Sequence, residues 1–386
     1  MKKLFYFAAA AVALAACAKN EVIPVNSGEN QEITFNVAPK TKGTVTVPST
    51  DPRYFNEDNH FVSYAYFRKD RNEWPGTEGE IYINAADISF TDNKWKDASS
   101  TYYWPKSDKS SLTFFAWSTN SASITLTGAT VKCDSKSGIS VSKYDVITNK
   151  NVDLLVADVA ANKKANEDLY SHNGVPTLFR HKLSYLIFKV KTAADYKTKD
   201  GKEFFINSIT LLGFDSKGSY SQKADNKTST DPSPIVYDKT GVWSDFEGKN
   251  AAGATTPSEQ KYFNATGDVE FGTEVKSLDA IAGVDQKYYL PQTITAITED
   301  PSPTTDYTIE VVYTIKTTEP YPATTASTVT TETVKKYIKA SEIYGENWEI
   351  NKKYTCTLTF SLNEILWDPA VENWEEVSAP TSGLTI

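Results

Sequence analysis

The sequence is poor in the residues from which most catalytic and metal sites are built. Its 386 residues include only 3 His and 3 Cys. No two of His60, His172 and His181 stand at the spacing of metal ligands, and no two cysteines form a C-x-x-C motif. Neither a G-x-S-x-G elbow nor a phosphate-cradling glycine loop occurs. We therefore predict a protein that is not an enzyme, with no catalytic residue, metal site or cofactor.

Excess basic charge and long apolar runs are also missing. The 40 Lys and Arg are outnumbered by 49 Asp and Glu, which gives a net charge of -9. Proteins that bind nucleic acid present basic surfaces, so we predict no nucleic-acid partner. The mean hydropathy is -0.43, and no run in the chain reaches the roughly 20 apolar residues of a membrane-spanning helix.

The first seventeen residues have the pattern of an export signal. Two lysines precede an apolar run over residues 4–14, and Leu14-Ala15-Ala16-Cys17 follows it. A short apolar run before small residues is typical of a secretory signal peptide. A cysteine directly after these residues is typical of the lipobox of bacterial lipoproteins, although an ordinary signal cut near a chance cysteine would look the same. We predict a signal peptide over 1–16, lipidation at Cys17 and a flexible tether over 17–30.

Beyond the tether, apolar and polar residues alternate at the two-residue period of a β-strand. Aromatic residues reach 12%, which suits wide, half-buried sheets. The expected strands are 33–37, 61–67, 112–117, 153–159, 183–190, 206–214, 307–315 and 355–362. No helical stripe of useful length is present, apart from one turn expected at 340–344. The Thr-rich segment 317–333 is expected to form a long hairpin tip, and the fold class is all-β.

A faint internal repeat suggests how the strands are divided. Tyr102-Tyr103-Trp104-Pro105 and Tyr288-Tyr289-Leu290-Pro291 each precede an apolar strand. Aromatic-Pro strand ends are common, so two copies do not prove a duplication. The length nevertheless suits two domains. We predict two β-sandwiches in tandem, over 31–174 and 175–386.

The remaining cysteines and one histidine have structural interpretations. A disulfide between Cys133 and Cys356 is permitted outside the cytoplasm, but one distant pair is no framework. Cys356 lies on the apolar side of its strand, so a buried free thiol is expected. His181 enters an apolar strand and is expected to be a satisfied core residue. Trp104 and Trp117 are likewise expected in the core.

The whole chain resembles the fimbrillin-like lipoproteins of Bacteroidetes, the family of the major and minor fimbrillins. The resembling segments are, in chain order, the lipobox, Ile33-Thr34-Phe35, Tyr102-Tyr103-Trp104-Pro105 leading to 112–116, and then 153–157, 178–184 and 348–354. The resemblance implies transthyretin-like β-sandwiches. It also implies a fimbrial subunit, exported as a lipoprotein to the outer membrane, that contributes to cell adhesion.

The same resemblance implies a route of assembly. An N-terminal strand is removed by proteolysis at the cell surface, and a strand of another subunit, usually its C-terminal tail, fills the groove. Family members are cut after an Arg close behind the first strand. The candidates for cleavage here are Lys40, Lys42 and Arg53. The tail 371–386 offers the donor candidates Val377, Ala379, Leu384 and Ile386. The alternative is that this tail is simply the last edge strand of the second sandwich.

The implied partners are other fimbrial subunits, the outer membrane through the lipid, and a host glycan or protein receptor. Two further functions stay open at the level of sequence. One is a surface lipoprotein that does not polymerise and binds glycans through some of its 8 Trp. The other is a fimbrial anchor or tip subunit, because Lys40 and Lys42 stand where the family has Arg.

Overall fold

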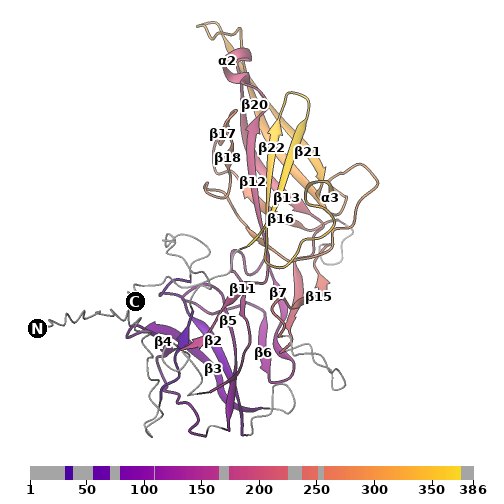
Figure 1. Ribbon diagram of the computed structural model, residues 1–386. Helices are drawn as coiled ribbons and strands as arrows, with labels where there is room; N and C mark the ends of the chain where they lie inside the picture. The colour runs from indigo at the N-terminus through magenta and orange to yellow at the C-terminus, as the bar shows by residue number, and fades with distance from the viewer. Residues whose placement is uncertain are drawn as a thin grey trace, which may run out of the picture.

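The computed structural model describes residues 31–37, 55–69, 79–107, 109–164, 174–224, 237–250 and 256–374. Strands account for 52% of the protein and helices for 3%, so the predicted all-β class is confirmed. Figure 1 shows two lobes, the lower built mainly from the indigo-to-purple N-terminal half and the upper from the pink-to-yellow C-terminal half. In the described ranges, no helix has the length and hydropathy needed to cross a bilayer.

A nine-stranded sheet that curls on itself forms the greater part of the first lobe. The strand order is β10-β1-β4-β3-β2-β5-β8-β11, with β9 beside β5. The bounds are β1 (Phe35–Asn36), β2 (Phe61–Arg68), β3 (Glu80–Thr91), β4 (Lys94–Asp97), β5 (Ser111–Ser118), β8 (Leu155–Ala157), β9 (Ala160–Lys163), β10 (Val175–Pro176) and β11 (Phe179–His181). Only residues 177 and 178 separate the two edge strands, so the opposite edges of the sheet come within about 10 Å of each other.

Strands β2 and β5 bury side chains on both faces of this sheet. Phe61 and Phe114 point into the core that the curled sheet encloses, whereas Tyr64 and Phe115 point into a second core. A four-stranded sheet, ordered β15-β14-β7-β6, covers the second core. Its bounds are β6 (Thr130–Asp134), β7 (Gly138–Asp145), β14 (Lys217–Gln222) and β15 (Val242–Glu247). Burial on both sides explains why all eight residues of β5 are buried and why its sequence does not alternate.

The second lobe is a sandwich of two sheets over a single core. One sheet has the order β18-β12-β22-β23 with β19 beside β12, and the other has the order β16-β13-β20-β21 with β17 beside β13. The bounds are β12 (Ser184–Thr192), β13 (Lys202–Leu212), β16 (Glu259–Asn264), β17 (Glu270–Phe271), β18 (Lys276–Ser277), β19 (Tyr288–Tyr289), β20 (Thr308–Glu319), β21 (Thr328–Lys339), β22 (Lys352–Phe360) and β23 (Ile365–Asn373). Two helical turns, α2 (Tyr196–Asp200) and α3 (Ala340–Tyr344), complete the described elements.

The chain passes between the lobes more often than a simple tandem arrangement requires. It leaves the first lobe after β11, builds β12 and β13 in the second, returns to the first with β14 and β15, and then goes back. The division expected at residue 174 lies inside the first lobe, because β10 and β11 follow it and still pair in the nine-stranded sheet. The separation into two folding units stays a prediction.

Every strand expected from the sequence overlaps a strand of the structure. The helical turn at 340–344 coincides with α3, and the expected hairpin is the pair β20 and β21 with its turn over 320–327. Several strands were not expected, among them β3, β7, β14, β15 and β23. Polar residues interrupt the apolar pattern of each of them, and β7, β14 and β23 also carry Gly or Pro, so local alternation did not indicate these strands.

Candidate functional site

The first described segment, residues 31–37, is hydrogen-bonded along both of its sides. On one side, Ile33 donates its backbone N–H to the carbonyl of Tyr102, and Trp104 donates to the carbonyl of Gln31, both at 2.8 Å. The strand continues antiparallel to β4. The tyrosine-rich motif found in the sequence therefore provides one wall for the N-terminal strand.

On its other side the same segment runs parallel to β10. Val175 and Thr177 donate their backbone N–H groups to the carbonyls of Thr34 and Asn36, at 2.7 and 2.8 Å. This wall is short, because β10 has only two residues. Segment 31–37 thus lies between two backbone edges that both depend on it for hydrogen bonds.

The inward side chains of this segment complete the core of the curled sheet. Ile33, Phe35 and Val37 are 3%, 5% and 1% exposed. The ring of Phe35 meets Phe61 edge-on at 5.4 Å and 86°, and Phe114 at 5.9 Å and 90°. Such edge-to-face pairs contribute about 0.5–1.5 kcal/mol each beyond the burial of area. Removal of the segment would open an apolar slot between two unpaired backbone edges.

The last described strand, β23, lies at an edge of its sheet. It pairs with β22 over its whole length, and its outer side pairs with no strand among the described residues. Leu366 and Val371 are 54% and 52% exposed. Pro369 is compatible with an edge because its nitrogen has no hydrogen to donate. The first three residues of the expected donor tail, 371–373, belong to this strand.

Trp374 fixes the end of β23 against the first lobe. Its indole is 3% exposed and lies parallel to the His181 ring at 3.5 Å and 6°. The rings of Tyr185 and Tyr288 stack on it at 5.1 and 5.4 Å. Its backbone N–H donates to the carbonyl of Asn351 at 2.8 Å. The point from which the C-terminal residues 375–386 depart is therefore held at the junction of the lobes.

The partner of Trp374, His181, is itself held by a buried carboxylate. Its Nδ1 lies 3.0 Å from a carboxylate oxygen of Asp153, and the two residues are 0% and 3% exposed. The expectation of a core histidine is confirmed, but only Nδ1 is satisfied, because the buried Nε2 has no hydrogen-bond partner among the described residues. An imidazole that is stacked on one face and paired to a carboxylate is well oriented, and it contributes to packing at the junction.

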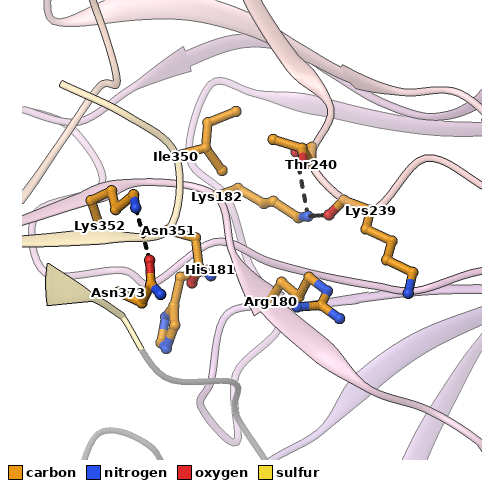
Figure 2. Close-up of a pocket in the computed structure, with 9 residues that line it drawn as sticks. All are labelled: Arg180, His181, Lys182, Lys239, Thr240, Ile350, Asn351, Lys352 and Asn373. Carbon is orange, nitrogen blue, oxygen red and sulfur yellow. Dashed lines mark hydrogen bonds between the residues drawn. The ribbon is translucent and has the colours of Figure 1, made fainter. Parts of the chain in front are cut away.

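A pocket of about 280 Å³ opens beside this stack (Figure 2). Its lining residues are Arg180, His181, Lys182, Lys239, Thr240, Ile350, Asn351, Lys352 and Asn373. None of them is Asp or Glu, so the wall offers no carboxylate. The Lys352 ammonium donates to the Asn373 side-chain oxygen at 2.8 Å. The lining therefore combines residues of both lobes.

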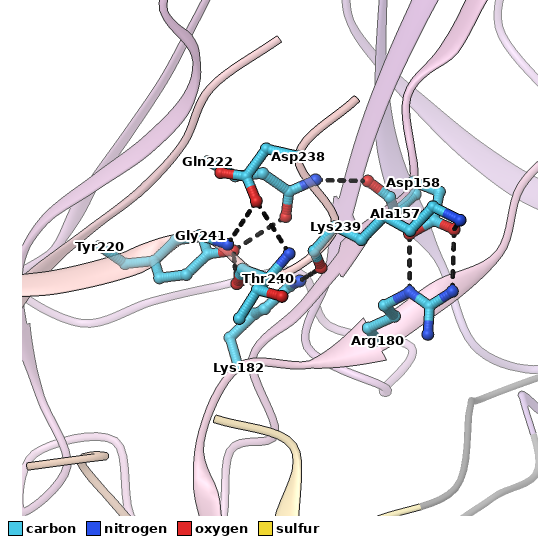
Figure 3. Close-up of polar contacts among 10 residues, drawn as sticks. All are labelled: Ala157, Asp158, Arg180, Lys182, Tyr220, Gln222, Asp238, Lys239, Thr240 and Gly241. Atoms are coloured by element: carbon cyan, nitrogen blue, oxygen red, sulfur yellow. Dashed lines mark hydrogen bonds and ion pairs between the residues drawn. The ribbon is translucent and has the colours of Figure 1, made fainter. Parts of the chain in front are cut away.

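One wall of this pocket is a polar network that fixes the β14–β15 hairpin to β8 and β11 (Figure 3). The buried Lys182 ammonium donates to the carbonyls of Lys239 at 2.7 Å and Thr240 at 3.5 Å. The guanidinium of Arg180 forms a two-point ion pair with Asp158, at 2.7 and 3.0 Å. Burial lowers the pKa of Lys182 to about 7, against an opposing effect of the Asp158 charge.

The same network extends through β14. The Tyr220 hydroxyl donates to the carbonyl of Thr240 at 2.9 Å, and Gln222 Nε2 donates to the carbonyl of Ala157 at 3.1 Å. Trp243 of β15 donates its indole N–H to the carbonyl of Lys182 at 2.7 Å. No sequence pattern indicates this network, because its members lie in or beside β8, β11, β14 and β15, far apart along the chain.

The site residues expected from the sequence lie outside the described residues. These are Cys17, the cleavage candidates Lys40, Lys42 and Arg53, and the donor candidates Val377, Ala379, Leu384 and Ile386. What the structure does place is the strand that such a cleavage would release and the root of the tail that would donate. Those two features form the candidate assembly site.

The other predicted residues are placed directly. Cys133 and Cys356 are both free thiols, and Cys356 is buried as expected. Burial raises the pKa of both thiols to about 12, so neither is a reactive thiolate. Trp104 and Trp117 are core residues, 4% and 6% exposed. Across the described part of the chain, no group of His, Cys, Asp and Glu side chains could hold a metal ion.

Comparison with known proteins matches this architecture. A family model described as fimbrillin-like matches residues 72–374. A fimbrial protein from Bacteroides vulgatus has a similar fold, with a TM-score of 0.54 and 18% identity over 90% of this chain and 100% of that one. A protein from Bacteroides uniformis with a provisional assignment to cell adhesion has a TM-score of 0.43 and 14% identity, over 89% of this chain and 98% of that one. No curated protein matches.

Proposed function

The chain belongs to the fimbrillin-like family, and from this premise we propose that it is a fimbrial subunit that joins other subunits by strand exchange and contributes to cell adhesion. The observation that carries the proposal is the position of segment 31–37. Its three inward side chains are at most 5% exposed, and its backbone pairs on both sides. Such a segment is a removable part of the core whose loss creates a binding slot for another strand.

The proposed assembly starts with a cut in the connection that follows the segment. Cleavage at Lys40, Lys42 or Arg53 would leave segment 31–37 held by non-covalent contacts alone. Its departure would expose the backbone edges at residues 102–104 and β10, together with the apolar slot between them. A strand supplied by another subunit would restore both sets of hydrogen bonds. In turn, Val377, Ala379, Leu384 and Ile386 are the candidate donor side chains of this chain.

The proposed location is the cell surface, as part of a fimbrium reached by the lipoprotein route. The support is the Leu14-Ala15-Ala16-Cys17 motif. Acylation of Cys17 would hold the protein at the outer membrane, since two or more long acyl chains give stable anchoring. Replacing Cys17 by Ala should abolish palmitate labelling, and labelling that persists in Cys17→Ala would contradict the route.

One feature of the sequence favours a second candidate, a fimbrial anchor or an unprocessed surface lipoprotein. Lys40 and Lys42 stand where the family has Arg, so the processing protease has no Arg directly behind the first strand. Binding of glycans by such a lipoprotein would need exposed aromatic platforms. Trp104 and Trp117 are buried and do not supply them.

A single experiment separates these candidates. The surface-assembled protein would be isolated and its N-terminus sequenced. A start between Thr41 and Tyr54 is expected for a processed subunit, whereas a start at Cys17 would indicate the anchor or the unprocessed lipoprotein. A matched assay compares polymer yield after trypsin treatment for the full chain and for a chain that lacks residues 382–386. Equal yields would rule out the tail as donor to a second copy of this chain.

A further inference from the structure

The slot that segment 31–37 occupies has a defined pattern of side-chain positions. Its inward residues are Ile33, Phe35 and Val37, spaced by two, and all are buried. The residues between them, Thr34 and Asn36, are only partly buried and use their carbonyls to accept hydrogen bonds from β10. Any strand that replaces the segment must therefore present three core side chains at alternate positions.

The middle position of the slot is surrounded by aromatic rings. Phe35 contacts Phe61 and Phe114 edge-on. These two rings are supported in turn by Phe179, 5.4 Å from Phe61, and by Trp104, 5.7 Å from Phe114. Rings that support one another cannot easily collapse onto a smaller side chain, so a non-aromatic residue at this position leaves a cavity.

The tail of this chain does not offer that pattern. Residues 375–386 contain no aromatic residue. Aligned on the slot, the triplet 377, 379 and 381 places Ala379 at the middle position, and the triplet 382, 384 and 386 places Leu384 there. Pro380 and Gly383 interrupt the segment between the two triplets, and Pro removes a backbone donor.

We propose that the slot selects a donor strand with the pattern apolar–x–aromatic–x–apolar, and that this strand comes from a different subunit, not from the tail of a second copy of this chain. The proposal rests on the strand-exchange function proposed above. The protein would then connect two different kinds of subunit. Its own slot takes an aromatic side chain at the middle position, whereas its tail offers only Ala379 or Leu384 there and so suits a slot with less space at that position.

Peptide exchange into the slot provides the test. A specific protease site would be inserted within residues 38–54 of the full chain, and the chain would be cut there. Fluorescent peptides would then compete for the slot: residues 31–37, the same peptide with Phe35→Ala, its control with Thr34→Ala, and residues 375–386. The 31–37 peptide and the Thr34→Ala control should bind about equally, and the Phe35→Ala and tail peptides about tenfold or more weakly.

The outcomes separate the two proposals. Peptides that bind equally well with and without Phe35 would overturn the aromatic selection and leave strand exchange intact. A tail peptide that binds as tightly as 31–37 would identify a second copy as the donor. Failure of every peptide, including 31–37, would overturn strand exchange at this slot and the selection with it.

A measurement on the uncut chain tests the aromatic selection without any exchange of strands. Phe35→Leu should lower the melting temperature by about 3 °C or more, because the supported rings leave a cavity around the smaller side chain. Asn36→Ala, on the outward face of the same strand, is the matched control and should change it little. Equal melting temperatures for Phe35→Leu and the original chain would overturn the aromatic selection.

Discussion

Two buried side chains, those of Trp374 and Lys182, connect several strands at the junction of the lobes. Trp374 contacts three rings that come from β11, β12 and β19. Lys182 donates to the loop before β15 while its own carbonyl accepts from Trp243. Substitutions at these two positions should therefore affect the stability of both lobes, and each has a distinct signature.

The signature of Lys182 is a dependence on pH. Its pKa in the folded protein is about 7, whereas an exposed lysine has a pKa near 10.4. Between these values the unfolded chain binds the proton more than the folded chain does, so Lys182 makes stability rise with pH above about 7, by up to about 1.4 kcal/mol per pH unit. Below pH 7 both states are protonated and this contribution to the slope disappears. Near pH 8.5 and above, the buried thiols of Cys133 and Cys356 act in the opposite direction, because they ionise in the unfolded chain first.

Lys182→Met should remove that rise. The measurement is the free energy of unfolding in urea from pH 6 to pH 8, where most thiols and tyrosines of the unfolded chain stay protonated. Lys239, whose side chain lines the same pocket but is 55% exposed, gives the control. Lys239→Met should keep the slope of the original protein. If the free energy of unfolding of Lys182→Met changed with pH as it does in the original protein, the pKa of Lys182 would not be lowered by burial.

The signature of Trp374 is a large loss of packing. Trp374→Ala should lower the free energy of unfolding by about 3–5 kcal/mol, because a buried indole is lost and the surrounding rings are left with a cavity. Leu366→Ala, at an exposed position of the preceding strand β23, should change it by less than about 0.5 kcal/mol. Urea denaturation of both variants gives the comparison, and similar small losses would mean that β23 holds without the Trp374 contacts.

Among the elements, β10 is a strand of only two residues, and Gly174, directly before it, lies close to the backbone of segment 31–37. Gly174 has a φ of +86°, and a Cβ added to it would lie 2.7 Å from the carbonyl carbon of Phe35. Gly174→Ala should therefore push β10 away from segment 31–37 and weaken the bonds from Val175 and Thr177. Hydrogen exchange of these two amides should become faster, and stability should fall.

Gly128 offers a matched control for this effect. It also has a positive φ, +74°, but an added Cβ would meet nothing within 4 Å. Gly128→Ala should carry only the cost of the backbone conformation, about 1 kcal/mol. Equal losses for the two variants would mean that the close approach at Gly174 contributes nothing to β10.

The sequence predicted those elements whose local pattern and burial agree. Segments with one apolar face, such as 307–315, were recognised, and so was the N-terminal strand with Ile33, Phe35 and Val37. The partner of that strand could not be predicted, because β10 contains only two residues and exists through its neighbour. Likewise, nothing in the sequence connects Trp374 with His181, 193 positions earlier (374 − 181), since only the fold brings their rings together.

At the scale of the whole molecule, the two lobes are connected by several passages of the chain and by side-chain contacts. The second core of the first lobe includes Tyr220 and Trp243. It also includes Leu290, which directly follows β19, a strand of the second lobe. Lys150 in the first lobe pairs with Asp285 at 2.6 Å. The sheets are thus arranged in two lobes, but the chain passes between the lobes several times.

A fragment that ends at residue 174 tests this dependence. It lacks β10, β11, β14 and β15, and so leaves both cores of the first lobe incomplete. We expect no cooperative unfolding transition and weak near-ultraviolet circular dichroism, in contrast to the full chain under the same conditions. A fragment that unfolds cooperatively would show that the boundary at 174 separates two autonomous domains.

The return of β14 and β15 to the first lobe also sets the order in which the protein can be completed. A polypeptide made at about 5–20 residues per second needs roughly 3–13 s to extend from His181 to Glu247. During that interval β7 has β6 beside it but lacks β14, and the face of β5 that carries Phe115 and Trp117 is only partly covered. The first lobe, although encoded first, cannot finish folding before β12 and β13 of the second lobe have been synthesised.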